Sequence, residues 1–138
     1  MTAKELIDEI IDLRNKVSAL EKLIKFYDDK SLSIPGQDFT EERVDKSRNF
    51  EAPFVKWIYK KIECEEKKER ISHVLDEKLY SLSNIIEEID NDEYKAILIG
   101  RYVVFMEWEE IAKQLSYSVG TVYKKHRQAF AELERIVK

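Results

Sequence analysis

Apolar residues recur at alternating steps of four and three along residues 3–30, and this heptad pattern constrains the fold more than any other feature. The stripe consists of Leu6, Ile10, Leu13, Val17, Leu20, Ile24 and Tyr27. Such spacing predicts an amphipathic helix that packs against another helix. Ile7, Ile11 and Leu23 widen the stripe, so the isolated helix would leave a broad apolar surface in water. The partner is either a helix of the same chain or a second copy, and the pattern alone leaves both open.

A second helical segment follows a break in the pattern. Residues 31–50 lose the helical period and contain Pro35-Gly36, which predicts a loop. Pro53 suits the first turn of a helix. Apolar residues then mark one face, interrupted by a charged stretch at 63–70: Phe54, Trp57, Ile58, Ile62, Ile71, Leu75, Leu79, Leu82, Ile86 and Ile89. We expect residues 1–89 to form a helical hairpin or coiled-coil arm with a loop near residues 31–50.

The C-terminal residues have the pattern of two short helices joined by a tight turn. The first helix is apolar at Trp108, Ile111, Ala112 and Leu115, and the second at Val122, Ala129, Phe130 and Leu133. Between them, Ser116-Tyr117-Ser118 breaks the period, and Ser118 is a good N-cap for the second helix. Two helices at this spacing predict a helix-turn-helix, whose second helix fits the major groove of DNA.

A supporting helix is expected just before this motif, over about residues 92–104. Asp90 with Glu93 fits a capping box, and Asp92 is the alternative N-cap. Gly100 falls in mid-helix, where we expect it to allow close packing of a neighbouring helix.

The motif resembles the promoter-binding fourth region of bacterial sigma factors. The residues that carry the resemblance are Arg101-Tyr102, Trp108-Glu109-Glu110-Ile111-Ala112, Leu115, Ser118, Val122, Ala129, Phe130 and Leu133. A coiled coil before a sigma-like helix-turn-helix is also similar to small phage-encoded transcriptional regulators of the ArpU and RinA type. The resemblance implies that residues 90–138 form a DNA-binding domain and that residues 119–136 enter the major groove.

The resemblance further implies which side chains contact DNA. The residues from the capping Ser118 onward would approach the bases: Val119, Gly120, Thr121, Tyr123 and Lys124. Lys125, Arg127 and Gln128 are better placed for phosphate. Sigma factors usually carry long charged side chains where Val119 and Gly120 stand, so we do not expect recognition of a standard promoter element. His126 is interpreted as a surface residue.

The net charge of −4 is unevenly distributed along the chain. Residues 94–138 hold eight Lys or Arg against five Glu, or +3, so residues 1–93 carry −7. We expect the acidic part to lie away from phosphate. A charge of +3 supports only a few phosphate contacts, which favours a homodimer or a further partner.

Composition limits the possible fold classes, cellular compartments and catalytic functions. Three Gly, two Pro and 38% charged residues predict an all-α fold. Cys64 is the single cysteine, which fits a reduced cytoplasm, and neither a long apolar run nor a signal-peptide pattern suggests a membrane. Motifs for catalysis, zinc or phosphate loops are absent from the sequence, and the four acidic residues at 38–45 lack calcium-loop spacing. We therefore expect no enzyme activity, metal or cofactor.

Two functions from different classes follow. The first is a sequence-specific regulator of transcription, phage or prophage encoded, that binds double-stranded DNA as a homodimer, with RNA polymerase as a further candidate partner. The alternative is a coiled-coil adaptor that acts on RNA polymerase or another host protein and uses its helix-turn-helix only structurally. A sigma subunit is disfavoured because nothing resembles the sigma region that melts promoter DNA.

Overall fold

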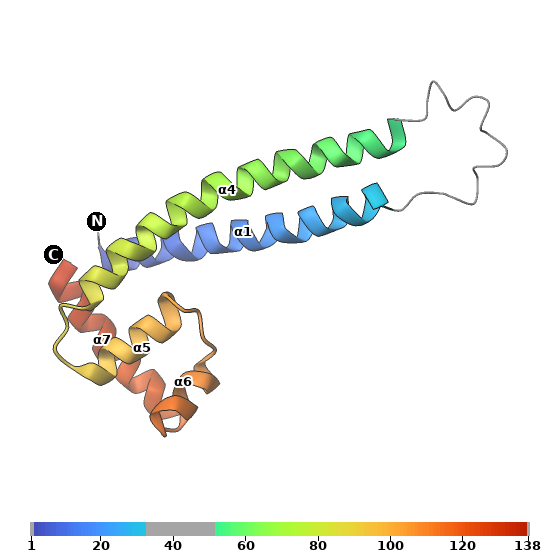
Figure 1. Cartoon of the computed structure of the whole chain (residues 1–138). Helices are drawn as coiled ribbons and strands as arrows, with labels where there is room; N and C mark the ends of the chain where they lie inside the picture. Colours follow the sequence, from blue (N-terminus) through green and yellow to red (C-terminus); the bar gives the residue numbers. More distant parts are fainter. Residues whose placement is uncertain (1, 33–51, 138) are drawn as a thin grey trace, which may run out of the picture. The chain divides into compact units, whose positions relative to one another are not determined.

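The computed structural model describes residues 2–32 and 52–137, and every regular element in these ranges is an α-helix (Figure 1). The helices are α1 (Ala3–Leu32), α4 (Ala52–Ile86), α5 (Asp92–Tyr102), α6 (Trp108–Leu115) and α7 (Val119–Val137). The predicted all-α fold class is confirmed. None of these helices is long and apolar enough to cross a membrane.

The chain divides into two compact units, which we name by their content. The helix-turn-helix unit contains Met1–Leu13 and Val74–Lys138, and the arm unit contains Arg14–His73. The helix-turn-helix unit thus includes the first turns of α1 and the last turns of α4 as well as α5, α6 and α7.

In the arm unit, α1 and α4 run antiparallel. Lys61 Nζ lies 2.8 Å from Asp28 Oδ1, and Lys68 Nζ lies 3.3 Å from Glu21 Oε2. A later residue of α4 thus pairs with an earlier residue of α1, as expected for two antiparallel helices of a hairpin. The heptad stripe of α1 has its partner helix in the same chain.

The boundaries of the hairpin differ slightly from those predicted. The charged stretch at 63–70 interrupts the apolar face but not the helix, because α4 is continuous through it. Ser31 and Leu32, predicted as loop, belong to α1, where Ser31 Oγ donates to the carbonyl oxygen of Asp28 at 2.9 Å. The rest of the predicted loop, with its acidic residues, lies outside the described residues.

The interior of the helix-turn-helix unit is built from all five helices. Its buried apolar residues are Ala3, Leu6, Ile7, Ile10, Leu75, Leu82, Ile86, Ile89, Ile97, Leu98, Ile111, Ala112, Val122, Ala129 and Leu133. Burial of one large aliphatic side chain contributes about 1.5–3 kcal/mol, so the ends of α1 and α4 add substantially to this core. Two polar contacts accompany it: the Ala3 N–H donates to Glu134 Oε1 at 3.0 Å, and Lys78 Nζ pairs with Glu9 at 2.9 Å.

The start of α5 corrects one prediction. Its N-cap is Asn91, not Asp90 or Asp92, since Asn91 Oδ1 accepts hydrogen bonds from the backbone N–H groups of Glu93 and Tyr94 at 2.9 and 3.1 Å. All three residue types cap helices well, and their adjacency in sequence hid which one lies at the boundary.

The predicted role of Gly100 is confirmed. It is buried, and a Cβ added there would lie 3.3 Å from Ile111 Cγ1. The turn that follows is tight: the Met106 N–H donates to the carbonyl oxygen of Gly100 at 2.7 Å, and Phe105 adopts a positive φ of 65°. A bulky residue rarely takes this left-handed conformation, so the turn holds backbone strain.

Candidate nucleic-acid interface

Helices α6 and α7 are joined by residues 116–118 in the predicted helix-turn-helix arrangement. Ser116 ends α6 in the left-handed conformation (φ 61°, ψ 39°), where a glycine would be unstrained. The Tyr117 N–H donates to the carbonyl oxygen of Ala112 at 2.9 Å, which closes the turn. At the start of α6, the Glu110 carboxylate accepts a hydrogen bond from the Glu107 N–H at 3.1 Å.

Ser118 caps α7 as predicted. Its hydroxyl oxygen accepts a hydrogen bond from the Thr121 N–H at 3.2 Å and lies 2.9 Å from Thr121 Oγ1. The two hydroxyl groups are therefore bonded to each other at the first turn of the helix.

One side of α7 is buried, and this fixes the side that faces outward. Val122, Ala129 and Leu133 are each fully buried, and Val122 belongs to a cluster with Ile97 and Ile111. Six of the predicted DNA contacts are exposed: Ser118, Gly120, Tyr123, Lys124, Arg127 and Gln128. Val119, Thr121 and Lys125 are half-buried.

Lys125 is engaged in a network that the sequence did not predict. Its Nζ lies 3.2 Å from Glu93 Oε1 and 5.2 Å from the centre of the Tyr117 ring, and the Tyr117 hydroxyl donates to Glu93. That hydrogen bond, together with Lys125, lowers the pKa of Glu93, and Glu93 raises the pKa values of Tyr117 and Lys125. The network connects the start of α5, the turn and α7.

The other flank of α7 rests on Trp108. The Trp108 ring meets Tyr123 edge-on at 5.1 Å and His126 at 4.9 Å, and the Arg101 guanidinium lies 4.5 Å from its centre. The ring contacts orient Tyr123, whose side chain is nevertheless 43% exposed. The interpretation of His126 as a surface residue is wrong, because its ring is half-buried between Trp108 and Tyr102.

Of two further outward residues, Gln128 has a hydrogen-bond partner within the unit and Arg127 borders a groove. The Gln128 side chain accepts a hydrogen bond from the Tyr94 hydroxyl at 3.0 Å. Arg127 borders a groove of about 580 Å³ between α1, α5 and α7, whose apolar wall includes Ile7, Ile11 and Phe130. Lys124 and Arg127 form no ion pair with any residue that the structure describes.

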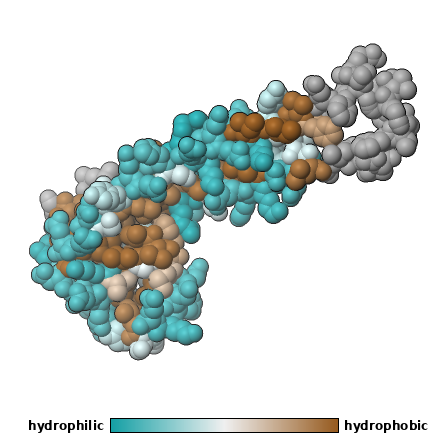
Figure 2. Space-filling view, in the orientation of Figure 1, coloured by the Kyte–Doolittle hydropathy of each residue, from teal (hydrophilic) through white to brown (hydrophobic). Residues whose placement is uncertain are grey.

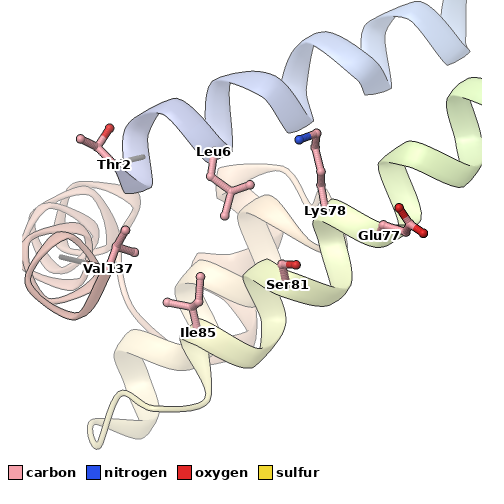
Figure 3. Close-up of a pocket in the computed structure, with 7 residues that line it drawn as sticks. All are labelled: Thr2, Leu6, Glu77, Lys78, Ser81, Ile85 and Val137. Atoms are coloured by element: carbon pink, nitrogen blue, oxygen red, sulfur yellow. The ribbon is translucent and has the colours of Figure 1, made fainter.

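A second groove, of about 430 Å³, lies between the first turns of α1, the end of α4 and the end of α7 (Figure 3). Leu6, Ile85 and Val137 form its apolar wall, and Lys78 with Glu77 stands at one side. Across the described ranges, no group of three or more His, Cys, Asp or Glu could hold a metal ion.

Residues 39–134 match the family described as a protein of unknown function, DUF1492. The chain belongs to the DUF1492 family. No curated protein matches it, and no solved structure does. The DUF1492 match covers α4, α5 and α6 and all of α7 except its last three residues, and it leaves out α1.

The environment of His126 predicts a pH dependence of stability. Burial lowers the pKa of His126, assisted by Arg101 and Arg127, from about 6.5 in the unfolded chain. The folded state then binds fewer protons, so the free energy of unfolding is highest above pH 6.5 and decreases as the pH falls below it. Urea unfolding at about pH 7.5 and pH 5.5 should show this decrease.

His126 Nε2 lies 2.7 Å from the Tyr102 hydroxyl, and the matched variant His126→Gln retains a neutral hydrogen-bonding side chain that does not titrate. We expect its stability to change less between the two pH values than that of the parent chain. An equal change in both proteins would contradict the assignment to His126.

Proposed function

We propose that the chain is a sequence-specific DNA-binding protein that regulates transcription and inserts α7 into the major groove. The observation that carries the proposal is the exposed side of α7. From Val119 to Ala131 the helix contains no acidic residue, although the chain has 28 Asp and Glu. Lys124 and Arg127 stand on its outer side, next to the short Gly120. Because Gly120 has no side chain, the backbone of α7 can approach the floor of a DNA groove closely. The two cations can then reach the phosphates at its edges.

Within this surface, each group has a distinct part. Lys124 can bond to the acceptor edge of guanine, and Gln128 can pair with adenine once it leaves the Tyr94 hydroxyl. Arg127 supplies a phosphate contact. Lys125 acts through Glu93 to fix the helix, so it contributes less to binding than its charge suggests.

The resemblance to phage regulators of the ArpU and RinA type and to the fourth sigma region supports the same proposal. It suggests a site close to a promoter and RNA polymerase as a second partner. The single Cys64 is compatible with a reduced cytoplasm as the setting.

Selection from a random duplex library at about 150 mM salt tests the proposal, since lower salt inflates non-specific binding. We expect an enriched motif for the parent chain and none for a Lys124→Ala, Arg127→Ala variant. The control is Lys95→Ala, Lys113→Ala, which removes the same charge from α5 and α6 and should retain the motif. Failure of the parent chain to enrich any motif would contradict the proposal and favour the adaptor alternative.

Gly120 provides a second test, because nothing in the fold requires a glycine there. A Cβ at Gly120 would meet no atom within 4 Å. Replacement by Ala should raise the free energy of unfolding by about 0.5–1 kcal/mol through helix propensity, and yet weaken DNA binding several-fold by holding the backbone away from the groove. Urea unfolding and fluorescence anisotropy measure the two effects.

Gly100→Ala is the control for this variant, since a Cβ at Gly100 would lie 3.3 Å from Ile111 and should destabilise the fold. A Gly120→Ala protein that binds DNA as tightly as the parent would show that close approach at this position is not needed.

We also propose a homodimer, formed through the apolar side of the arm unit. Ile58 and Ile62 are 41% and 44% exposed, and an uncovered apolar side of a long helix is typical of an interface. A two-fold contact brings the same patch of each copy together, which an uncharged patch permits.

Light scattering at tens of micromolar should therefore give the mass of a dimer for the parent chain and of a monomer for Ile58→Ser, Ile62→Ser. The control Tyr80→Ser changes a side chain that is 71% exposed in the other unit and should leave the dimer intact. A monomeric parent chain would exclude this interface.

A further inference from the structure

Exposed cations form a row along one side of α4 in the arm unit. Lys56, Lys60, Lys67 and Arg70 are spaced by four, seven and three residues, so they fall on one side of the helix. All four are exposed, and none has an ion pair with a described residue. The exposed Glu63 lies on the same side, three residues after Lys60. The exposed apolar pair Ile58 and Ile62 follows Lys56 and Lys60 by two positions, or about 200° around the helix.

Aromatic contacts place part of α1 on the same side as this row. Lys30 Nζ lies 5.7 Å from the centre of the Phe26 ring, Phe26 meets Trp57 edge-on at 5.9 Å, and Lys56 Nζ lies 5.3 Å from the centre of Trp57. The two lysines are thus held by rings that touch each other. The exposed residues of α1 within one turn of Phe26 include Lys22, Leu23, Asp29 and Lys30, and Asp29 pairs with Lys25 of its own helix at 3.5 Å.

The lysines one position further along α4 behave differently. Lys61 pairs with Asp28 and Lys68 pairs with Glu21. The carboxylates of α1 therefore neutralise that edge of the hairpin. The row at Lys56, Lys60, Lys67 and Arg70 has a single carboxylate, Glu63, on its side of the helix and keeps an excess of positive charge.

The arm unit is basic in a chain that is acidic overall. Residues 14–73 contain fourteen Lys and Arg against twelve Asp and Glu, a net charge of +2, and the described parts 14–32 and 52–73 carry +4, whereas the whole chain has −4. The expectation that the N-terminal 93 residues are uniformly repelled by phosphate therefore needs refinement. Their acidity is concentrated at 1–13, with −3, and at 74–93, with −6.

We propose that the row of cations on the arm unit is a second DNA-contact surface, which binds backbone phosphates without reading sequence. The inference rests on the proposed function and supplies what α7 lacks, since α7 offers only Lys124 and Arg127 as uncompensated cations. From Lys56 to Arg70 the row spans about 21 Å at about 1.5 Å per residue, comparable to about six base pairs of duplex at roughly 3.4 Å each. DNA is favoured over an acidic protein because protein interfaces are depleted in lysine.

The test compares two variants of the full chain that lose the same charge from neighbouring positions. Lys60→Gln, Lys67→Gln removes two cations of the row, and Lys61→Gln, Lys68→Gln removes the two compensated lysines. Anisotropy titrations would use the selected duplex and a scrambled duplex between about 50 and 200 mM salt. Circular dichroism and thermal unfolding check that both variants remain helical.

For Lys60→Gln, Lys67→Gln we expect affinity about tenfold lower on both duplexes and a salt dependence smaller by about 1.8 in log–log slope, from two lost phosphate contacts. The motif selected by this variant should be that of the parent. Equal affinities and slopes for the two variants would overturn the inference while leaving the proposed function intact. If the parent chain binds neither duplex, the proposed function and this inference both fail.

Discussion

Burial of Val122, Ala129 and Leu133 sets the rotation of α7 about its own axis, and the candidate interface depends on that rotation. With these side chains inside, Gly120, Lys124 and Arg127 can only face outward. Two lateral contacts also hold α7 in this rotation: the Glu93–Lys125 pair lies on one flank and the Trp108 ring on the other. A helix held on three sides presents its outer groups with little loss of freedom on binding, which favours affinity.

The sequence predicted what is determined locally. The helix-turn-helix, the Ser118 cap and the packing role of Gly100 each follow from spacing within a few residues, and the structure has all three. The sequence did not predict the partner of Lys125 or the burial of His126. Both depend on contacts with α5, whose residues lie about 24 to 32 positions earlier in the chain. Whether the outer groups bind DNA is likewise beyond what periodicity determines.

Charge provides a second example of long-range organisation. The first 93 residues have a net negative charge, but the fold divides them between two units. The arm unit has a net positive charge, and the segments that belong to the helix-turn-helix unit have a net negative charge. In the arm unit, salt bridges between α1 and α4 neutralise one edge and leave cations on the other side (Figure 2 shows the mixed polar and apolar surface of the arm). A net charge summed along the sequence therefore conceals surfaces that a polyanion can distinguish.

The first turns of α1 lie in the same buried core as α7, and the Ala3 N–H is bonded to Glu134 near the C-terminal end of α7. The C-terminal helices are consequently not a portable module. Exchange of that segment between relatives would separate α7 from the apolar residues that α1 and α4 contribute to the same core. Substitution at Gly120, Lys124 and Arg127 changes the outer side of α7 without disturbing the core, because these positions are exposed. Divergence of this surface should therefore proceed by point changes rather than by shuffling.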